Sequence, residues 1–230
     1  MPTEPAKPDR PTVTDRASYW DRYATGIRTT DAPETALKNA FGWTQYEGHG
    51  PGDELLGEPA TALELGSSRG HAVAALATKG IDTTGVDLSL VQVEGARQRW
   101  GHLPNAHFVH ADVITFLTSA RERRWEAIYS IFGALWFTDP EQWMPLVRAR
   151  LAPGGRLVFS CAPAVPGTAG VQGMYGAGFT GPQVWIYRWT YEPGEWARLL
   201  TGTGFREVDA RVEPAPDPRN VGTLIVEARA

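Results

Sequence analysis

The sequence contains very little cysteine, no long apolar run and no excess of basic residues. Cys161 is the single cysteine among 230 residues, so an internal disulfide and a cysteine-rich zinc site are excluded, and a reducing cytosol is expected. No apolar run approaches the roughly 20 residues that a membrane span requires, and the N-terminus lacks an apolar signal core. Lysine plus arginine number 22 against 26 acidic residues, which argues against a nucleic-acid partner. We therefore expect a soluble cytoplasmic protein that binds neither membranes nor nucleic acids.

The chain divides by composition into three parts. Residues 1–16 begin with prolines spaced among charges, and we expect a disordered tail. Residues 17–58 carry short amphipathic patterns broken by Gly and Pro, which predict an N-terminal helical cap. In residues 59–230 short apolar strands alternate with helical segments, and this alternation predicts an α/β fold with a doubly wound, mostly parallel sheet.

One segment of the third part departs from this alternation. Residues 161–182 are rich in Gly, Ala and Pro and show neither a helical nor a strand period, so we expect a long functional loop. We treat residues 161–191 as an insertion that shapes a substrate pocket. Ligands of parallel sheets bind at the carboxyl ends of the strands, which places the expected site directly after Leu65, Val86, Ala111 and Ile131.

The loop after the first strand indicates which ligand is bound. It reads Glu64-Leu-Gly66-Ser-Ser68-Arg-Gly70 and leads into a helix, and Asp87 follows at the end of the next strand. A dinucleotide loop requires G-x-G-x-x-G, whereas the last glycine here comes one residue early. An acidic residue before the loop would repel a pyrophosphate but suits a cationic amino group and a sulfonium. The pattern therefore favours S-adenosylmethionine (SAM) over NAD.

Five motifs in this order resemble the class I SAM-dependent methyltransferases over roughly residues 60–230. They are ELGSSRG, GVDLS, HADV, SIFGALWFTDP and LAPGGRLVFS. The resemblance implies seven strands in the order 3-2-1-4-5-7-6, with the seventh antiparallel. SIFGALWF is similar to the variant found in methyltransferases of quinone and secondary-metabolite pathways. One departure is Ser68, which stands where the family usually has its middle glycine.

The resemblance also implies a set of cofactor-binding residues. Glu64 would order the loop and face the methionine amino group, Asp87 would bind the ribose, and Asp112 with Val113 would bind the adenine. For both aspartates the alternative is that they only cap the next helix. The whole predicted set is Glu64, Gly66, Ser67, Ser68, Gly70, Asp87, Leu88, Asp112, Val113, Ile131 and Phe132.

Substrate and catalytic residues are predicted from the cap and the insertion. His49 lies in a Gly-rich stretch of the cap and is the preferred general base because its unperturbed pKa suits proton removal near neutral pH. An ordinary loop histidine is the alternative, and His71 is the second candidate. Tyr19, Trp20 and Tyr23 form a helical stripe that either closes on the cofactor or packs against another helix. The predicted substrate contacts are Tyr46, Trp136, Tyr175, Tyr187 and Arg188.

The sequence therefore predicts an enzyme that moves a methyl group from SAM to an oxygen or nitrogen of a small molecule, of the kind made in specialised or antibiotic metabolism. S-adenosylhomocysteine would be the second product. Two alternatives stay open, a C-methyltransferase of the same fold and a non-catalytic SAM-binding protein. We expect no metal, because the acidic and histidine residues lack a convergent ligand set. A homodimer is compatible with the sequence.

Overall fold

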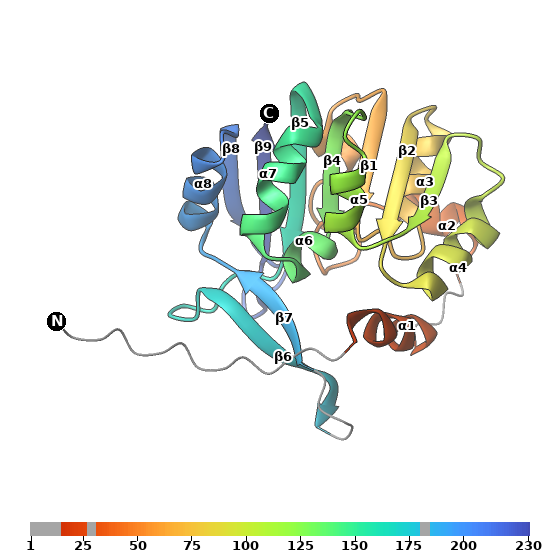
Figure 1. Ribbon diagram of the computed structural model, residues 1–230. Helices are drawn as coiled ribbons and strands as arrows, with labels where there is room; N and C mark the ends of the chain where they lie inside the picture. The colour runs from red at the N-terminus through yellow and green to blue at the C-terminus, as the bar shows by residue number, and fades with distance from the viewer. Residues whose placement is uncertain (1–14, 27–30, 180–184) are drawn as a thin grey trace.

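The computed structural model describes residues 15–26, 31–179 and 185–230. Figure 1 shows one large twisted sheet with helices packed against it and a separate two-stranded hairpin below its edge. The helices are α1 (Arg16–Gly26), α2 (Pro33–Lys38), η1 (Asp53–Leu56), α3 (His71–Thr78), α4 (Leu90–Trp100), α5 (Val113–Ser119), α6 (Ala134–Phe137), α7 (Pro140–Arg150) and α8 (Pro193–Gly202). The strands are β1 (Thr61–Leu65), β2 (Asp82–Asp87), β3 (Ala106–His110), β4 (Trp125–Ile131), β5 (Leu151–Cys161), β6 (Gly170–Phe179), β7 (Trp185–Thr190), β8 (Arg206–Glu213) and β9 (Thr223–Arg229).

The large sheet has seven strands in the order β3-β2-β1-β4-β5-β9-β8. The first five are parallel to one another, whereas β9 runs antiparallel to both β5 and β8. Because β6 and β7 lie outside this sheet, β8 and β9 are its sixth and seventh strands. The predicted order 3-2-1-4-5-7-6 and the antiparallel last strand are therefore confirmed.

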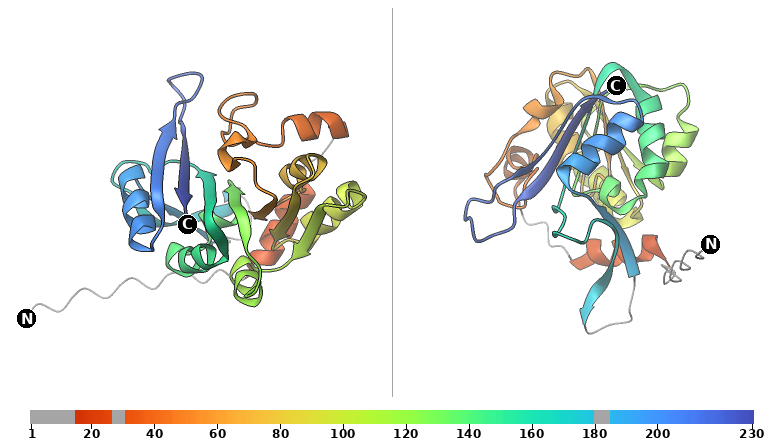
Figure 2. Two further views of the ribbon diagram at one scale, coloured as in Figure 1. Left: turned by 90° about the horizontal axis from the view of Figure 1, so that it is seen from above. Right: turned by 90° about the vertical axis from the view of Figure 1, so that its left-hand side faces the viewer.

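Apolar clusters fill both faces of the sheet. On one face α5, α7 and α8 cover a cluster that contains Trp125, Trp143 and Trp196. On the other face α3 and α4 pack around Trp100, with Ala36 of α2 against them. Figure 2 shows these helix layers on either side of the sheet. The central strands β1, β2 and β4 are mostly buried on both faces, as parallel strands between two helix layers must be.

Short side chains at the helix starts fix where several loops end. Ser89 Oγ accepts a hydrogen bond from the Gln92 N–H at the start of α4. Asp112 caps α5 and Asp139 caps α7 in the same way. Since each of these residues directly follows a strand or a strand-linked loop, the caps hold the carboxyl edge of the sheet in a defined conformation.

The prediction of an irregular loop over residues 161–182 is wrong for its second half. Residues 170–179 form β6, which pairs antiparallel with β7 from Gly170 opposite Thr190 to Tyr175 opposite Trp185. The Gly-rich sequence has little strand propensity of its own, so the pairing depends on its partner, whose aromatic and β-branched residues favour a strand. The hairpin projects past the lower edge of the sheet in Figure 1.

The predicted cap does not form one layer. Residues 1–14 of the predicted tail lie outside the described residues, and α1 begins at Arg16, one residue before the predicted boundary. Figure 1 shows α1 below the carboxyl edge of the sheet, whereas α2 packs on α3. Trp43 and Leu56 join a third apolar cluster with β1, β4 and β5. In the part of the chain that the structure describes, no helix is both long and apolar enough to cross a membrane.

Two glycines with the same backbone conformation allow a test of packing at the carboxyl edge. Gly66 has φ +84° and a Cβ there would lie 2.3 Å from the Ala134 backbone nitrogen, while Gly80 has φ +85° and open space around it. Gly80→Ala should therefore cost only the left-handed strain, about 1–2 kcal/mol. Gly66→Ala should cost about 1–3 kcal/mol more because the backbone has to move. Urea unfolding of both variants measures the difference, and equal losses would contradict the close contact.

Candidate functional site

A cavity of about 560 Å³ opens at the carboxyl edge of the sheet. Residues that follow β1, β2, β3 and β4 form its inner wall, and α1 and α6 form much of the rest. Its volume is within the usual range for a small-molecule site. The lining residues are Arg16, Tyr19, Trp20, Tyr23, Thr44, Gln45, Gly66, Ser68, Asp87, Leu88, Gln92, Asp112, Val113, Ile131, Phe132, Gly133, Ala134, Trp136, Phe137, Thr138 and Ala162.

A second hollow of about 750 Å³ lies at the opposite edge, between η1 and the starts of β1 and β2. Its lining includes Asp53, Glu58 and Lys79. None of the residues predicted to bind a ligand falls there. Parallel sheets carry their ligands at the carboxyl edge, so we assign the candidate site to the first cavity.

Most of the predicted cofactor residues meet at this cavity. Eight of the eleven line it, and three lie behind its wall. Those behind it are Glu64, Ser67 and Gly70. A Cβ at Gly70 would lie 2.3 Å from the Phe108 ring, so protein packing already explains why this position is glycine.

Asp87 ends β2 and faces the cavity while it holds the backbone around it. Its Oδ2 accepts from the Ser68 N–H at 2.8 Å, and its Oδ1 accepts from the Ser89 N–H, also at 2.8 Å. Burial raises the pKa of Asp87, and these two hydrogen bonds only partly oppose that effect. Ser68 has φ +47°, a left-handed conformation that explains the family's usual glycine there. Asp87 is therefore an acceptor fixed between two loops.

Asp112 combines the two roles that the sequence left as alternatives. Its Oδ1 accepts from the Ile114 N–H at 3.0 Å and from the Thr115 N–H at 3.1 Å, so it caps α5. The residue also lines the cavity beside Val113. Capping accordingly does not exclude adenine binding, which stays a prediction.

Glu64 lies beneath the loop and is almost fully buried. Tyr129 Oη donates to Glu64 Oε2 at 3.4 Å. Burial raises the pKa of Glu64 well above its ordinary value, and the nearby Asp87 charge adds to the rise, while the Tyr129 hydrogen bond opposes it. The structure thus places Glu64 as a buried support of the loop. Its predicted contact with a methionine amino group stays a prediction.

The aromatic stripe of α1 forms the outer wall of the cavity. Tyr19, Trp20 and Tyr23 all line it, and the Trp20 ring meets the Phe137 ring edge to face with centroids 4.8 Å apart. Polar contacts anchor α1 in its middle and near both ends. In the middle, Asp21 Oδ1 accepts a hydrogen bond from Ser89 Oγ at 2.5 Å. The Ala24 carbonyl accepts from Arg69 at 2.8 Å and the Phe137 carbonyl accepts from Arg16 at 3.1 Å. Of the two explanations for the stripe, the structure supports the one that closes over the site.

The segment after β4 forms the floor. Phe132 adopts φ +45° and its N–H donates to the Ser160 carbonyl at 3.0 Å. Trp136 and Phe137 follow on α6, with ring centroids 4.9 Å apart. The predicted cavity contact of Trp136 therefore has structural support. Among the described residues, Trp136 Nε1 and Thr138 Oγ1 are buried without a hydrogen-bond partner.

The predicted base His49 and the predicted substrate residue Tyr46 lie outside the cavity lining. His49 Nε2 lies 2.8 Å from the Pro214 carbonyl oxygen, and Tyr46 Oη donates to the Val221 carbonyl at 2.6 Å. Both residues therefore tie their segment to the loop between β8 and β9, which gives no support for a proton-transfer role of His49. The second candidate, His71, is also absent from the lining, and its ring meets Trp100 edge to face at 6.0 Å.

Arg188 and Tyr187, both predicted to bind substrate, are neighbours on β7, so their side chains lie on opposite faces of the hairpin. The Arg188 guanidinium carbon lies 5.4 Å from the Trp136 ring centroid, whereas Tyr187 lies on the other face of β7 with Trp189. Only Arg188 thus approaches the cavity wall. The side chain of Tyr175, also predicted to bind substrate, lies outside the described residues.

His107 and His110, which lie on β3 near the carboxylates of β2, contact separate partners. His107 Nε2 lies 2.8 Å from Asp82 Oδ1, and His110 Nε2 lies 3.0 Å from the Leu88 carbonyl oxygen. Within the described ranges, no group of three His, Cys, Asp or Glu side chains could hold a metal ion. Independence from metal stays a prediction.

Several cavity residues were not predicted from the sequence. Arg16 and Gln45 reach the site only because α1 and the segment after α2 fold back over the sheet. No local motif marks them. The α1 stripe was a signal for the helix as a whole, but it did not indicate which end of the sheet the helix covers.

Comparison with known proteins indicates the class of enzyme that this chain resembles. Residues 62–155 match the family model described as a methyltransferase domain. Together with the seven-stranded fold, the match confirms the resemblance to class I SAM-dependent methyltransferases.

Among curated proteins, a trans-aconitate 2-methyltransferase of Delftia acidovorans is 33% identical over 114 residues, which are 46% of this chain and 41% of that protein. The chain therefore matches less than half the length of this relative. Among solved structures, a complex of DhpI with S-adenosylhomocysteine is 21% identical with a TM-score of 0.62, covering 93% of this chain and 94% of that one. A Burkholderia thailandensis 1,6-didemethyltoxoflavin N1-methyltransferase is also 21% identical with a TM-score of 0.62, covering 98% and 93%. At such identities the structural likeness concerns the fold.

The residues present fit SAM. The cavity offers a carboxylate at the end of β2 and a second at the end of β3, as a ribose and an adenine require. Gly66 leaves the wall of the cavity without a side chain, and aromatic rings at the other end suit a sulfonium ion. These features support the prediction of SAM as the cofactor.

Replacement of Glu64 tests its electrostatic role. The pKa of Glu64 in the folded state lies well above its ordinary value of 4.5, so the folded state binds the proton more tightly than the unfolded chain. The free energy of unfolding consequently falls as the pH rises above 4.5 toward the folded-state pKa. The free energy of unfolding of Glu64→Gln should therefore fall less than that of the wild type between about pH 5 and pH 8. Urea unfolding across this range checks it, with the exposed Glu94→Gln as control. Parallel profiles for Glu64→Gln and wild type would sink the argument.

Asp87→Asn tests the ribose site. The change keeps the shape but removes the charged acceptor, so the dissociation constant for S-adenosylhomocysteine should rise roughly 10- to 100-fold. Asp82→Asn is a matched control, because Asp82 begins the same strand and pairs with His107 and Arg123 at the surface. Isothermal titration calorimetry measures both variants. An unchanged affinity in folded Asp87→Asn would place the ribose elsewhere.

Proposed function

We propose that the protein is a SAM-dependent methyltransferase that transfers a methyl group to an oxygen or nitrogen of a small molecule, and that this molecule is a specialised metabolite. One observation carries the proposal. The cofactor residues predicted at the ends of β1, β2, β3 and β4 meet in one cavity, and aromatic side chains of α1 and α6 close its remaining side.

The two groups of relatives support a small-molecule acceptor. The curated relative is named for trans-aconitate, and one solved structure is named as an N1-methyltransferase of 1,6-didemethyltoxoflavin. Both names denote small molecules. The volume of the cavity is in keeping with such an acceptor beside the cofactor.

The chain's own residues act in this reaction chiefly by positioning. When bound, SAM supplies a methyl group on a sulfonium, whose C–S electron pair stays on sulfur as the acceptor's lone pair forms the new bond. Asp87, Asp112 and the Gly66 loop hold the cofactor end of the cavity. Trp20 and Phe137 meet across the other end and exclude water from it. An in-line displacement needs such alignment more than it needs a strong base.

The cavity lining is consistent with an acceptor that brings its own reactive lone pair. Among the described residues that line it there is no histidine. Burial raises the pKa of Tyr19 above its ordinary value of 10.0, so Tyr19 is a neutral hydroxyl at physiological pH. Nitrogen acceptors and acidic oxygens react without a strong base. We therefore favour these over an unactivated alcohol.

Methyl transfer is tested with methyl-labelled SAM and a deproteinised metabolite extract of the source organism. We expect one labelled small molecule and a matching amount of S-adenosylhomocysteine, both detected by mass spectrometry. Fragmentation of the product identifies the atom that received the label. Asp87→Asn should lower the rate at subsaturating SAM, since it weakens cofactor binding.

Three results would contradict the proposal in different ways. Binding of SAM without any labelled product indicates a non-catalytic SAM-binding protein. A label on carbon indicates a C-methyltransferase. Stronger calorimetric binding of NAD than of S-adenosylhomocysteine would overturn the cofactor assignment itself.

A further inference from the structure

The two ends of the cavity carry opposite charge. The acidic residues of its lining, Asp87 and Asp112, follow β2 and β3, at the end assigned to the adenosine part. The end beside α6 has no acidic side chain among the described lining residues. Arg16 from α1 lines that end, and Arg188 from β7 lies next to it, over the ring of the lining residue Trp136.

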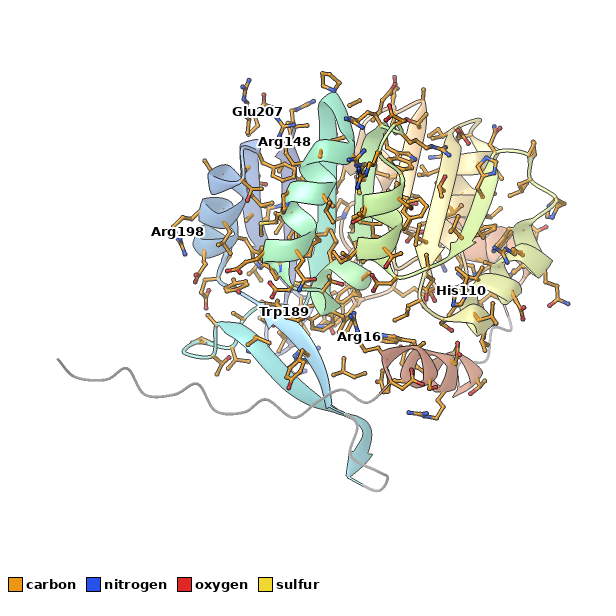
Figure 3. All side chains as sticks on the ribbon, in the orientation of Figure 1. Arg16, His110, Arg148, Trp189, Arg198 and Glu207 are labelled. Atoms are coloured by element: carbon orange, nitrogen blue, oxygen red, sulfur yellow. The ribbon has the colours of Figure 1, made fainter. Side chains whose placement is uncertain are left out.

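Arg16 reaches the cavity from the start of α1. One of its terminal nitrogens, Nη2, donates to the Phe137 carbonyl at 3.1 Å, and the residue is half-buried. Figure 3 shows Arg16 between α1 and the lower edge of the sheet. Because a guanidinium has five N–H donors, this one hydrogen bond leaves most of its donors for a ligand.

Arg188 approaches the same helix from the hairpin. Its guanidinium lies over the ring of Trp136, and its Nε donates to Gln172 Oε1 at 3.3 Å across the strand pair. The terminal nitrogens are not used in that bond. Burial raises the pKa of the Cys161 thiol to about 12, and the positive charge of Arg188 partly opposes this rise. Cys161 directly precedes Ala162, which lines the cavity. Arg188 therefore lies close to the floor of the cavity.

Neither arginine is neutralised within the described part of the chain. The ion pairs found there involve other residues, and Arg16 and Arg188 contact only a carbonyl, an amide and a ring. Half-buried arginines without an anionic partner are costly unless a ligand supplies one. Since they contact the adjacent residues Phe137 and Trp136, both charges flank one short helix.

A polar side chain of the same wall also lacks a partner. Thr138 is 4% exposed, lines the cavity, and its Oγ1 has no hydrogen-bond partner among the described residues. Trp136 Nε1, two residues earlier in the chain, is also buried without a partner among the described residues. A buried polar group without a partner is unfavourable. The wall around α6 thus presents hydroxyl and N–H groups as well as positive charge.

We propose that Arg16, Arg188 and Thr138 form a subsite for a carboxylate of the acceptor substrate, so that the enzyme methylates a small organic acid. The inference rests on the proposed methyltransferase function and deepens it. A carboxylate matches the planar fork of a guanidinium with two parallel hydrogen bonds. Held there, it anchors the acid and leaves a different oxygen or nitrogen of the same molecule as the acceptor.

The first experiment asks which metabolites are methylated. A deproteinised extract is separated by anion exchange at neutral pH before the reaction, and each fraction is incubated with the protein and methyl-labelled SAM. We expect the label in the retained, acidic fraction. Label only in unretained fractions overturns this inference but leaves the proposed function intact. No label in any fraction overturns the proposed function and this inference with it.

The second experiment uses the acid identified in this way. Arg188→Gln and Arg16→Gln should each raise its KM roughly 10- to 100-fold, with kcat changed less than roughly threefold. Arg188→Lys should recover part of the loss, since it keeps the charge but not the fork. Arg198→Gln is the matched control, because the exposed Arg198 of α8 lies far from Arg16, as Figure 3 shows.

Calorimetry with S-adenosylhomocysteine separates substrate binding from general damage. Its affinity should change less than roughly twofold in both variants, or about 0.4 kcal/mol. An unchanged KM in folded Arg188→Gln and Arg16→Gln overturns the inference. A loss of S-adenosylhomocysteine affinity in Arg16→Gln would show that Arg16 only holds α1 in place and would remove it from the subsite.

Discussion

The arrangement of the site depends on one close contact, between the loop after β1 and the start of α6. A Cβ at Gly66 would overlap the Ala134 backbone nitrogen, so the two segments touch through their main chains. Ser130 Oγ joins them, since it donates to the Leu65 carbonyl at 2.7 Å and accepts from the Leu135 N–H at 3.3 Å. The Gly66 N–H in turn donates to the Val86 carbonyl at 2.8 Å. The ends of β1, β2 and β4 are thereby held as one rigid edge, and the cofactor and substrate parts of the cavity share it.

The sequence predicted the sheet correctly, and most of the residues that it predicted to bind the cofactor meet at one cavity, because both depend on short segments. A strand end followed by glycine, or by an aspartate that caps the next helix, has a local signal, and parallel strands bring such ends together automatically. Asp87 and Asp112 were predicted in this way. Glu64 was predicted as well, but its burial beneath the loop and its raised pKa depend on the fold around it, including Tyr129 and Asp87, and no spacing rule contains these contacts.

Most of the residues predicted to bind substrate lie outside the cavity lining, because their positions depend on long-range docking. The assignment of His49 as the base required the whole cap to lie over the cofactor. Among the described residues of the cap, only α1 and a short part of the segment after α2 line the cavity, and His49 instead contacts the Pro214 carbonyl. The hairpin was missed because β6 has almost no strand propensity alone. Its pairing with β7 then decides that Arg188 faces α6 while Tyr187 faces away. Such outcomes follow from which faces pack together, and one sequence does not reveal them.

The two ends of the cavity differ in how their charged groups are held, and this difference allows one protein to bind a cationic cofactor and the proposed anionic substrate. The cofactor end uses carboxylates fixed by backbone N–H groups, so their orientation does not depend on the ligand. The substrate end uses long arginines from two separate elements, and each of them contacts α6. A bound acid would draw α1 and the hairpin toward each other across the cavity, because each supplies one positive charge. Substrate binding would then also tighten the aromatic wall that keeps water from the methyl group.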